Sequence, residues 1–113
     1  MALSGQLKAL YGPAYLANSI ANIYNQSSTL LYTRLRHIHI ANVTAGAVTF
    51  TLYIGGTGGS TGGTELYKGV SIPANSAFDY YPDRKLLSTD FLTGLASAAS
   101  SLVIDLEGEQ VVV

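Results

Sequence analysis

The feature that most constrains this chain is a series of short β-type segments, separated by turn residues at roughly 8–12-residue intervals. The clearest of them is residues 47–54, where apolar and polar side chains alternate strictly. No long segment has helical periodicity. The pattern predicts an all-β fold, a single β-sandwich or jelly-roll-like domain of about seven to eight short antiparallel strands. Its predicted inward side chains are Val48, Phe50, Leu52 and Ile54, followed later by Leu102, Ile104 and Leu106.

The 113 residues suit one domain, preceded by a segment of different character. Leu3, Leu7 and Leu10 are spaced along residues 1–13 in a way that fits either a short helix or an extended arm. Gly12-Pro13 would end any helix there. Because ten helical residues are marginal alone, this segment needs a surface to dock on. We expect an N-terminal arm over residues 1–13 and the β-sandwich domain over residues 14–113.

Two pairs of polar side chains lie on the strand that is predicted over residues 30–41. Strict alternation puts the two arginines, Arg34 and Arg36, on one face and the two histidines on the other. The arginines are suited to fork onto carboxylates of another chain. The first face would also carry Ile38 and Ile40, and the second Leu35. Residues 42–46 are predicted to form a hairpin connection to the next strand. Turns are also predicted at residues 25–28, 73–76 and 82–85, irregular chain at residues 86–94, a tight loop at residues 96–101 and the end of a strand at Gly108.

The histidines of that strand, His37 and His39, have a spacing that can supply two metal ligands. A zinc site needs three or four ligands, and the nearest acidic residue downstream is Glu65, beyond a glycine-rich run. We therefore predict no metal site and no cofactor. We expect instead that both histidines pack and form hydrogen bonds at a partly buried or inter-subunit surface.

Several kinds of chemistry are disfavoured by the sequence. The glycine run at residues 55–63 lacks the lysine of a phosphate loop, since the next lysine is Lys68, and it predicts a surface loop. No cysteine is present, and no serine lies in a nucleophile elbow. The acidic residues are scattered, so no catalytic pair is indicated. We predict that the protein is not an enzyme and has no catalytic residues.

Charge and hydropathy also argue against two classes of partner. Six lysines and arginines against seven acidic residues leave no basic footprint, so we predict no nucleic-acid binding. No run approaches the roughly 18 apolar residues of a membrane helix, so we predict no membrane association. Charged residues make up only 12% of the chain, which indicates that other chains cover much of its surface. Eight tyrosines suit such interfaces. The predicted interface residues are Leu3, Leu7, Leu10, Tyr11, Tyr15, Arg34, Arg36, Tyr80 and Tyr81.

Four stretches of the chain resemble small β-rich structural proteins of tailed bacteriophages, of the head decoration and minor tail type. The first stretch is residues 32–54, in which residues 40–46 read Ile-Ala-Asn-x-Thr-x-Gly and precede an alternating strand and a Gly/Ser-rich loop. Residues 69–76, which read Gly-Val-Ser-Ile-Pro-Ala-Asn-Ser, continue the pattern, as do residues 90–99 and 107–111. The resemblance covers roughly residues 11–113, and it brings no catalytic residues.

The resemblance implies a virion structural protein without enzymatic activity. The first expectation is a capsid decoration protein on the outer surface of the head, bound to the major capsid protein and to copies of itself as a trimer or another symmetric cluster. A minor tail or head–tail joining subunit is the alternative, which would place the protein at the tail or neck. A carbohydrate- or receptor-binding β-module is a further alternative, because exposed tyrosines can stack on sugars.

Overall fold

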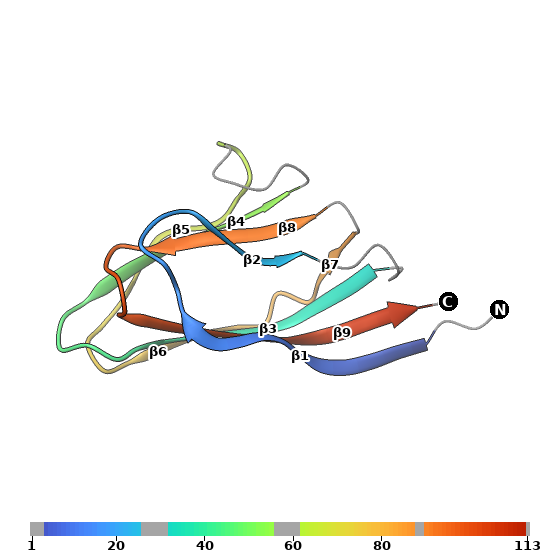
Figure 1. Ribbon diagram of the computed structural model, residues 1–113, viewed down its shortest axis with the longest axis horizontal. Helices are drawn as coiled ribbons and strands as arrows, with labels where there is room; N and C mark the ends of the chain where they lie inside the picture. Colours follow the sequence, from blue (N-terminus) through green and yellow to red (C-terminus); the bar gives the residue numbers. More distant parts are fainter. Residues whose placement is uncertain (1–3, 26–31, 56–61, 88–89, 113) are drawn as a thin grey trace.

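The protein is a sandwich of two antiparallel β-sheets (Figure 1), as the sequence predicts. The computed structural model describes residues 4–25, 32–55, 62–87 and 90–112. In these residues no helix has the length and apolarity that crossing a membrane requires. The nine described strands are β1 (Ser4–Tyr15), β2 (Ala21–Asn25), β3 (Tyr32–Asn42), β4 (Val48–Gly55), β5 (Glu65–Ile72), β6 (Ala77–Tyr80), β7 (Arg84–Leu86), β8 (Phe91–Ala96) and β9 (Leu102–Val112).

The strands divide into a larger and a smaller sheet. The larger sheet has the order β1-β9-β3-β6, with β7 also paired to β3, and the smaller sheet has the order β2-β8-β4-β5. Figure 1 shows the two sheets as facing layers, with the long strands β3 and β9 side by side. The core lies between the layers, and every predicted inward side chain of residues 47–54 and 102–106 is buried there. Alternation therefore identified the core correctly on β4 and on the first half of β9.

The N-terminal segment is extended, which is one of the two conformations that its sequence allows. β1 pairs with β9 from Ser4, opposite Val112, to Tyr15, opposite Val103. A helix of this length would be marginal, whereas the strand satisfies the free edge of β9. The pairing is irregular near Gly12, which has a φ of 81° and is followed by a cis peptide bond to Pro13. The division of the chain into an arm and a domain stays a prediction.

The facial assignment of β3 is wrong, because a β-bulge interrupts its alternation. The register against β9 shifts between Leu35 and His37, and the extra residue is Arg36. A bulge adds one residue, so the side chains after it change face. Leu35, Ile38 and Ile40 are consequently all buried. His37 and His39 lie with Arg34 on the opposite side of β3, away from the core.

Opposite the bulge lies Gly108, which was expected to end a strand but lies inside β9. Its residue partner on β3 is Leu35, and on the other side it pairs with Lys8 of β1. A Cβ atom at this position would collide with the carbonyl oxygen of Arg34 and with the side chain of Leu10. Glycine is therefore required because three strands approach each other closely here.

The connection at residues 42–46 is also different from the prediction. It does not form a hairpin, because β3 belongs to the larger sheet and β4 to the smaller one. The buried side chain of Asn42 holds this crossover through its amide and carbonyl groups. The side-chain amide donates to the backbone of Gly46 and Ile72, and the side-chain oxygen accepts from Thr44. Asparagine thus replaces the ladder hydrogen bonds that a hairpin would have supplied.

The remaining connections are mixed in outcome. The turn predicted at residues 73–76 is confirmed by a hydrogen bond from the Ser76 amide to the Pro73 carbonyl, 3.2 Å long. The tight loop at residues 96–101 is confirmed between β8 and β9. Residues 82–85 and 86–94 were expected to be a turn and irregular chain, but they contain β7 and β8. The turn predicted at residues 25–28 and most of the glycine loop lie outside the described residues.

Candidate functional site

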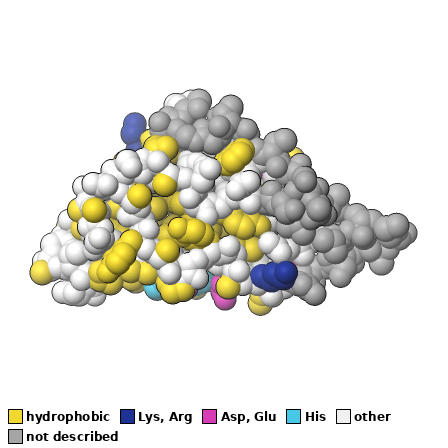
Figure 2. Space-filling view, viewed as in Figure 1, with side chains coloured by type: hydrophobic (Ala, Val, Ile, Leu, Met, Phe, Trp, Pro, Cys, Tyr) yellow, Lys and Arg dark blue, Asp and Glu magenta, His cyan; other side chains and the backbone are white. Residues whose placement is uncertain are grey.

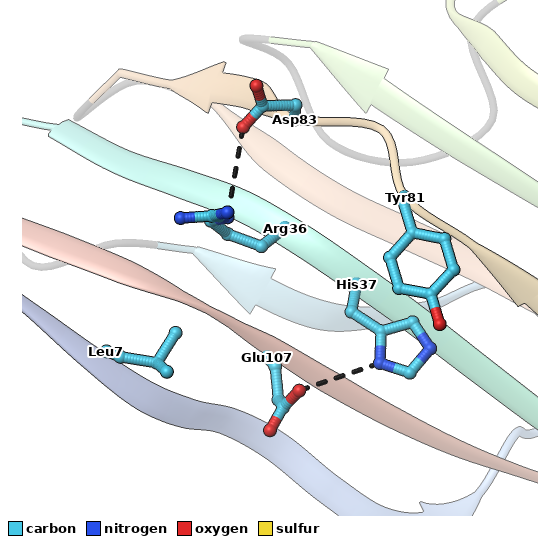
Figure 3. A pocket seen from close by; sticks show the side chains of 6 residues that line it. All are labelled: Leu7, Arg36, His37, Tyr81, Asp83 and Glu107. Atoms are coloured by element: carbon cyan, nitrogen blue, oxygen red, sulfur yellow. Dashed lines mark ion pairs between the residues drawn. The ribbon is translucent and has the colours of Figure 1, made fainter.

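An open groove lies on the outer face of the larger sheet, the side that faces away from the smaller sheet. Its volume is about 470 Å³. Strands β1, β9 and β3 and the connection between β6 and β7 supply its walls, as Figure 3 shows. The groove is lined by Leu7, Arg36, His37, Tyr81, Asp83 and Glu107. The bulge in β3 creates this site, because without it His37 would point into the core.

Next to the groove, two histidines share one carboxylate. His37 Nε2 lies 2.7 Å from Asp79 Oδ1, and His39 Nδ1 lies 2.6 Å from the same oxygen. The pairing of β3 with β6 explains this arrangement, since His39 and Asp79 are direct cross-strand partners. Hydrogen bonds from His39 and His37 hold the pKa of Asp79 below its ordinary range. We call these three residues the His–Asp cluster.

Neighbouring side chains hold the ring of His37 in place. The ring stacks on Tyr81, with centroids 4.5 Å apart and planes 6° from parallel. On its other nitrogen, His37 Nδ1 lies 3.6 Å from Glu107 Oε1 of β9 (Figure 3). His37 is therefore fixed by contacts from β6, from β9 and from the segment that follows β6. Such support is typical of side chains whose orientation matters to a site.

The two arginines find partners within the chain. Arg34 forks onto Asp83, with Nε 2.5 Å from Oδ1 and Nη2 2.8 Å from Oδ2. This hydrogen bond lowers the pKa of Asp83 and raises that of Arg34. Arg36 is less tightly held, with Nε 4.0 Å from Asp83 and Nη1 3.9 Å from Glu109. These pairs are exposed and contribute little to stability, so they leave Arg36 able to contact another chain.

The structure brings some predicted interface residues together and separates others. Leu7 (70% exposed) and Tyr81 (69% exposed) line the groove together with Arg36. Arg34 adjoins the groove through its fork onto Asp83. Tyr15 is exposed elsewhere on β1. Two others, Leu10 and Tyr11, pack against the core. Tyr80 packs edge-on to Tyr67, with 4.7 Å between the ring centroids. Leu3 lies outside the described residues.

Charge is sparse on much of the described surface, as the composition predicts. Figure 2 shows a view dominated by hydrophobic and uncharged side chains, in which histidine and acidic atoms lie at the lower edge. That edge corresponds to the larger sheet in Figure 1. Apart from Glu65, Lys68 and Asp90, the charged residues lie on strands of the larger sheet or on the connection between β6 and β7, as do both histidines.

Sequence reasoning missed Asp79 and Glu107 as partners of the histidines. Both are remote in sequence, and they reach the histidines only because β6 and β9 flank β3. A local signal existed for Asp79, because the apolar neighbours Phe78 and Tyr80 predict that it points outward from its strand. Nothing local predicts that its strand pairs with β3.

Comparisons with known proteins show the fold and no family. No protein-family model matches the chain, and no curated protein sequence matches it. Among solved structures, one from infectious bursal disease virus strain Gx matches with a TM-score of 0.57 and 8% identity. That match covers 97% of this chain, which spans only 32% of the viral one. A protein from the disulfide-linked pili of Bacillus endospore appendages matches with a TM-score of 0.50 and 16% identity, over 96% of this chain and 86% of the other. Both likenesses show a shared β-sandwich architecture.

Proposed function

We propose that this chain is a structural protein of a tailed-phage virion, and that it decorates the outer surface of the assembled head. The observation that carries the proposal is that two of the phage-like stretches form one structural unit. Asn42 of the Ile-Ala-Asn-x-Thr-x-Gly stretch donates to the Ile72 carbonyl at 2.9 Å, and the Asn75 amide donates to the Thr44 carbonyl at 3.1 Å. The resemblance therefore concerns residues that build the crossover between the sheets, where a shared fold would preserve them.

The proposed mechanism is mechanical rather than catalytic. A protein that binds only the assembled lattice stabilises that lattice by mass action. We assign the contact to the outer face of the larger sheet, where Leu7 and Tyr81 are exposed beside the groove. Tyrosine and arginine are enriched in protein interfaces, and Arg36 adds a cation at the same place. Copies of the chain would form a trimer or another symmetric cluster around each binding position.

The fold of both structural neighbours is compatible with this role. One comes from a virus and the other from a pilus-like appendage, as their descriptions state. A tail or head–tail joining subunit would use the same type of contact, so location separates these assignments. A carbohydrate-binding module would instead use the exposed ring of Tyr81 as a stacking platform.

Location on the particle tests the proposal. Purified virions are labelled with a gold-conjugated antibody against the chain and imaged in the electron microscope, with antibody preabsorbed on the recombinant chain as control. Label distributed over the head supports decoration. Label confined to the neck or tail assigns the protein to the joining or tail class and overturns the head assignment. Unlabelled virions, together with a positive glycan-array result, would favour the carbohydrate-binding alternative.

A further inference from the structure

The His–Asp cluster gathers three potential metal ligands from two paired strands. The ligand atoms of His37, His39 and Asp79 all lie within 4.8 Å of one another. β3 supplies two of them and β6 supplies the third, so the backbone ladder fixes their spacing. Sites built on strands are held more precisely than sites on loops. This feature is independent of any role in a virion.

The ligand atoms of the cluster lie somewhat closer together than the ligand atoms around a bound zinc ion. Ligand bonds to zinc of about 2.0–2.2 Å in tetrahedral geometry separate neighbouring ligand atoms by roughly 3.3 Å. The two histidine nitrogens are now 2.7 and 2.6 Å from Asp79 Oδ1. Moving each nitrogen outward by less than about 1 Å would open the space for an ion. All three side chains are partly exposed, so such rotations need no repacking of the core.

A second observation points to a ligand in the same place. A histidine that binds metal usually donates the N–H of its other ring nitrogen to a carboxylate, which fixes the tautomer and the ring orientation. In His37, Nε2 faces the cluster and Nδ1 faces Glu107 Oε1 at 3.6 Å. The stacked ring of Tyr81 limits rotation of the imidazole. Glu107 and Tyr81 therefore have the positions of orienting residues around a ligand.

We propose that His37, His39 and Asp79 bind a divalent transition-metal ion, with zinc as the reference ion and at least one coordination position left open. Two imidazoles and one carboxylate suit zinc, cobalt, nickel or copper, whereas magnesium and calcium require mostly oxygen ligands. Local charge favours a cation, because Asp79 and Glu107 contact the histidines while Asp83 engages Arg34. The ion would tie the edge strand β6 to β3.

Binding is measured on the tag-free full chain after chelator treatment, by titrating zinc chloride in a calorimeter. The expected result is one zinc ion per chain and a higher melting temperature of the wild-type chain in zinc. Magnesium chloride should give neither effect. Asp79→Asn should weaken zinc binding by more than 100-fold, and Glu107→Gln should weaken it by 10- to 100-fold, the effect typical of an orienting carboxylate.

Asp105→Asn is the matched control. Asp105 is the cross-strand partner of His39 on β9, and its replacement removes the same charge from the same face without removing one of the three ligands. The proposal predicts that zinc affinity in Asp105→Asn stays within about threefold of wild type. Nitrogen-15 spectra of the imidazoles should show zinc on Nε2 of His37 and on Nδ1 of His39. His39→Gln provides a second test of the same ligand set.

Three results would overturn the proposal. One is the absence of saturable zinc binding by the wild-type chain. Another is an equal loss of affinity in Asp79→Asn and Asp105→Asn, which would reduce the effect to non-specific attraction by surface charge. A third is zinc binding that leaves the ring nitrogens of His37 and His39 unchanged. In each case the cluster would be only a set of hydrogen bonds between β3 and β6.

Discussion

Replacing Asn42 with alanine should destabilise the protein more than any other single change to a polar side chain on the crossover between the sheets. The side chain is buried; its amide donates to three backbone carbonyls and its oxygen accepts two hydrogen bonds. Its amide lies 2.9 Å from the carbonyl oxygens of both Gly46 and Ile72. Its oxygen lies 2.9 Å from the Thr44 amide nitrogen and 2.7 Å from the Thr44 hydroxyl.

The magnitude follows from what each partner can do after the substitution. Gly46 and Thr44 lie near solvent and can exchange a lost bond for water, at about 0.5–1.5 kcal/mol each. The Ile72 carbonyl loses a buried bond, and an unsatisfied buried acceptor costs about 1–3 kcal/mol. The total is about 2–6 kcal/mol, which corresponds to a fall of about 8–25 °C in the melting temperature of a domain of this size.

Urea denaturation and thermal melts of Asn42→Ala and wild type measure the loss, with Asn22→Ala as control. Asn22 is an exposed asparagine on β2, and its replacement should change stability by less than about 0.5 kcal/mol. Asn42→Asp supplies a second test, because it keeps the acceptor for Thr44 but turns a carboxylate oxygen towards three carbonyl oxygens. Burial and those carbonyls raise the pKa of the introduced carboxyl. Its stability deficit should therefore shrink as the pH falls from about 7 to about 4.

The reasoning on Asn42 would be refuted by an Asn42→Ala loss no larger than that of Asn22→Ala. It would also be refuted if the Asn42→Asp deficit were the same at both pH values, because the amide would then not be donating to the backbone carbonyls.

Three further predictions concern the larger sheet. Gly108→Ala should lower the unfolding free energy measured in urea by about 1–3 kcal/mol, because the new Cβ collides with the Arg34 carbonyl. An unchanged urea midpoint of unfolding would show that β9 moves freely. The pKa of Asp79 is lower in the folded state than in the unfolded state, so its contribution to stability is complete above the ordinary carboxyl pKa and is lost as the pH falls through the lower, folded-state pKa. Asp79→Asn should therefore make the melting temperature fall less steeply as the pH is lowered into the acid range. Identical acid-range curves for the variant and the wild type would contradict this. Leu7→Ser and Tyr81→Ala should each leave the melting temperature within about 2 °C of wild type, but should reduce the amount of the chain that sediments with phage heads. Undiminished co-sedimentation would show that the contact lies elsewhere on the chain.

The sequence predicts the parts of the fold that depend on local patterning. The core faces of β4 and of the first half of β9 follow from simple alternation, and the turn at residues 73–76 follows from its proline and asparagine. These features need no knowledge of which strand lies beside which. The same reasoning places a boundary between β3 and β4 but predicts a hairpin at residues 42–46, where the chain in fact crosses from the larger to the smaller sheet. Which sheet a strand joins depends on the whole chain and not on the local pattern.

The candidate site depends on non-local structure, which explains why the sequence predicts only part of it. The bulge at Arg36 accompanies a close approach to Gly108 on another strand, and it moves His37 and His39 to the outer face together with Arg34. Asp79 joins the histidines only because β6 pairs with β3. Two histidines on one strand were visible as potential ligands, but the third group is 40 residues further along the chain.

Electron cryomicroscopy of intact virions tests the central claim most directly, because it gives both the location and the orientation of the chain. The account predicts density for the β-sandwich on the outside of the head, in symmetric clusters, with Leu7 and Tyr81 of the larger sheet facing the capsid lattice. Heads without this density would contradict the proposed function. Sandwich density whose larger sheet faces solvent would contradict the assignment of the contact surface.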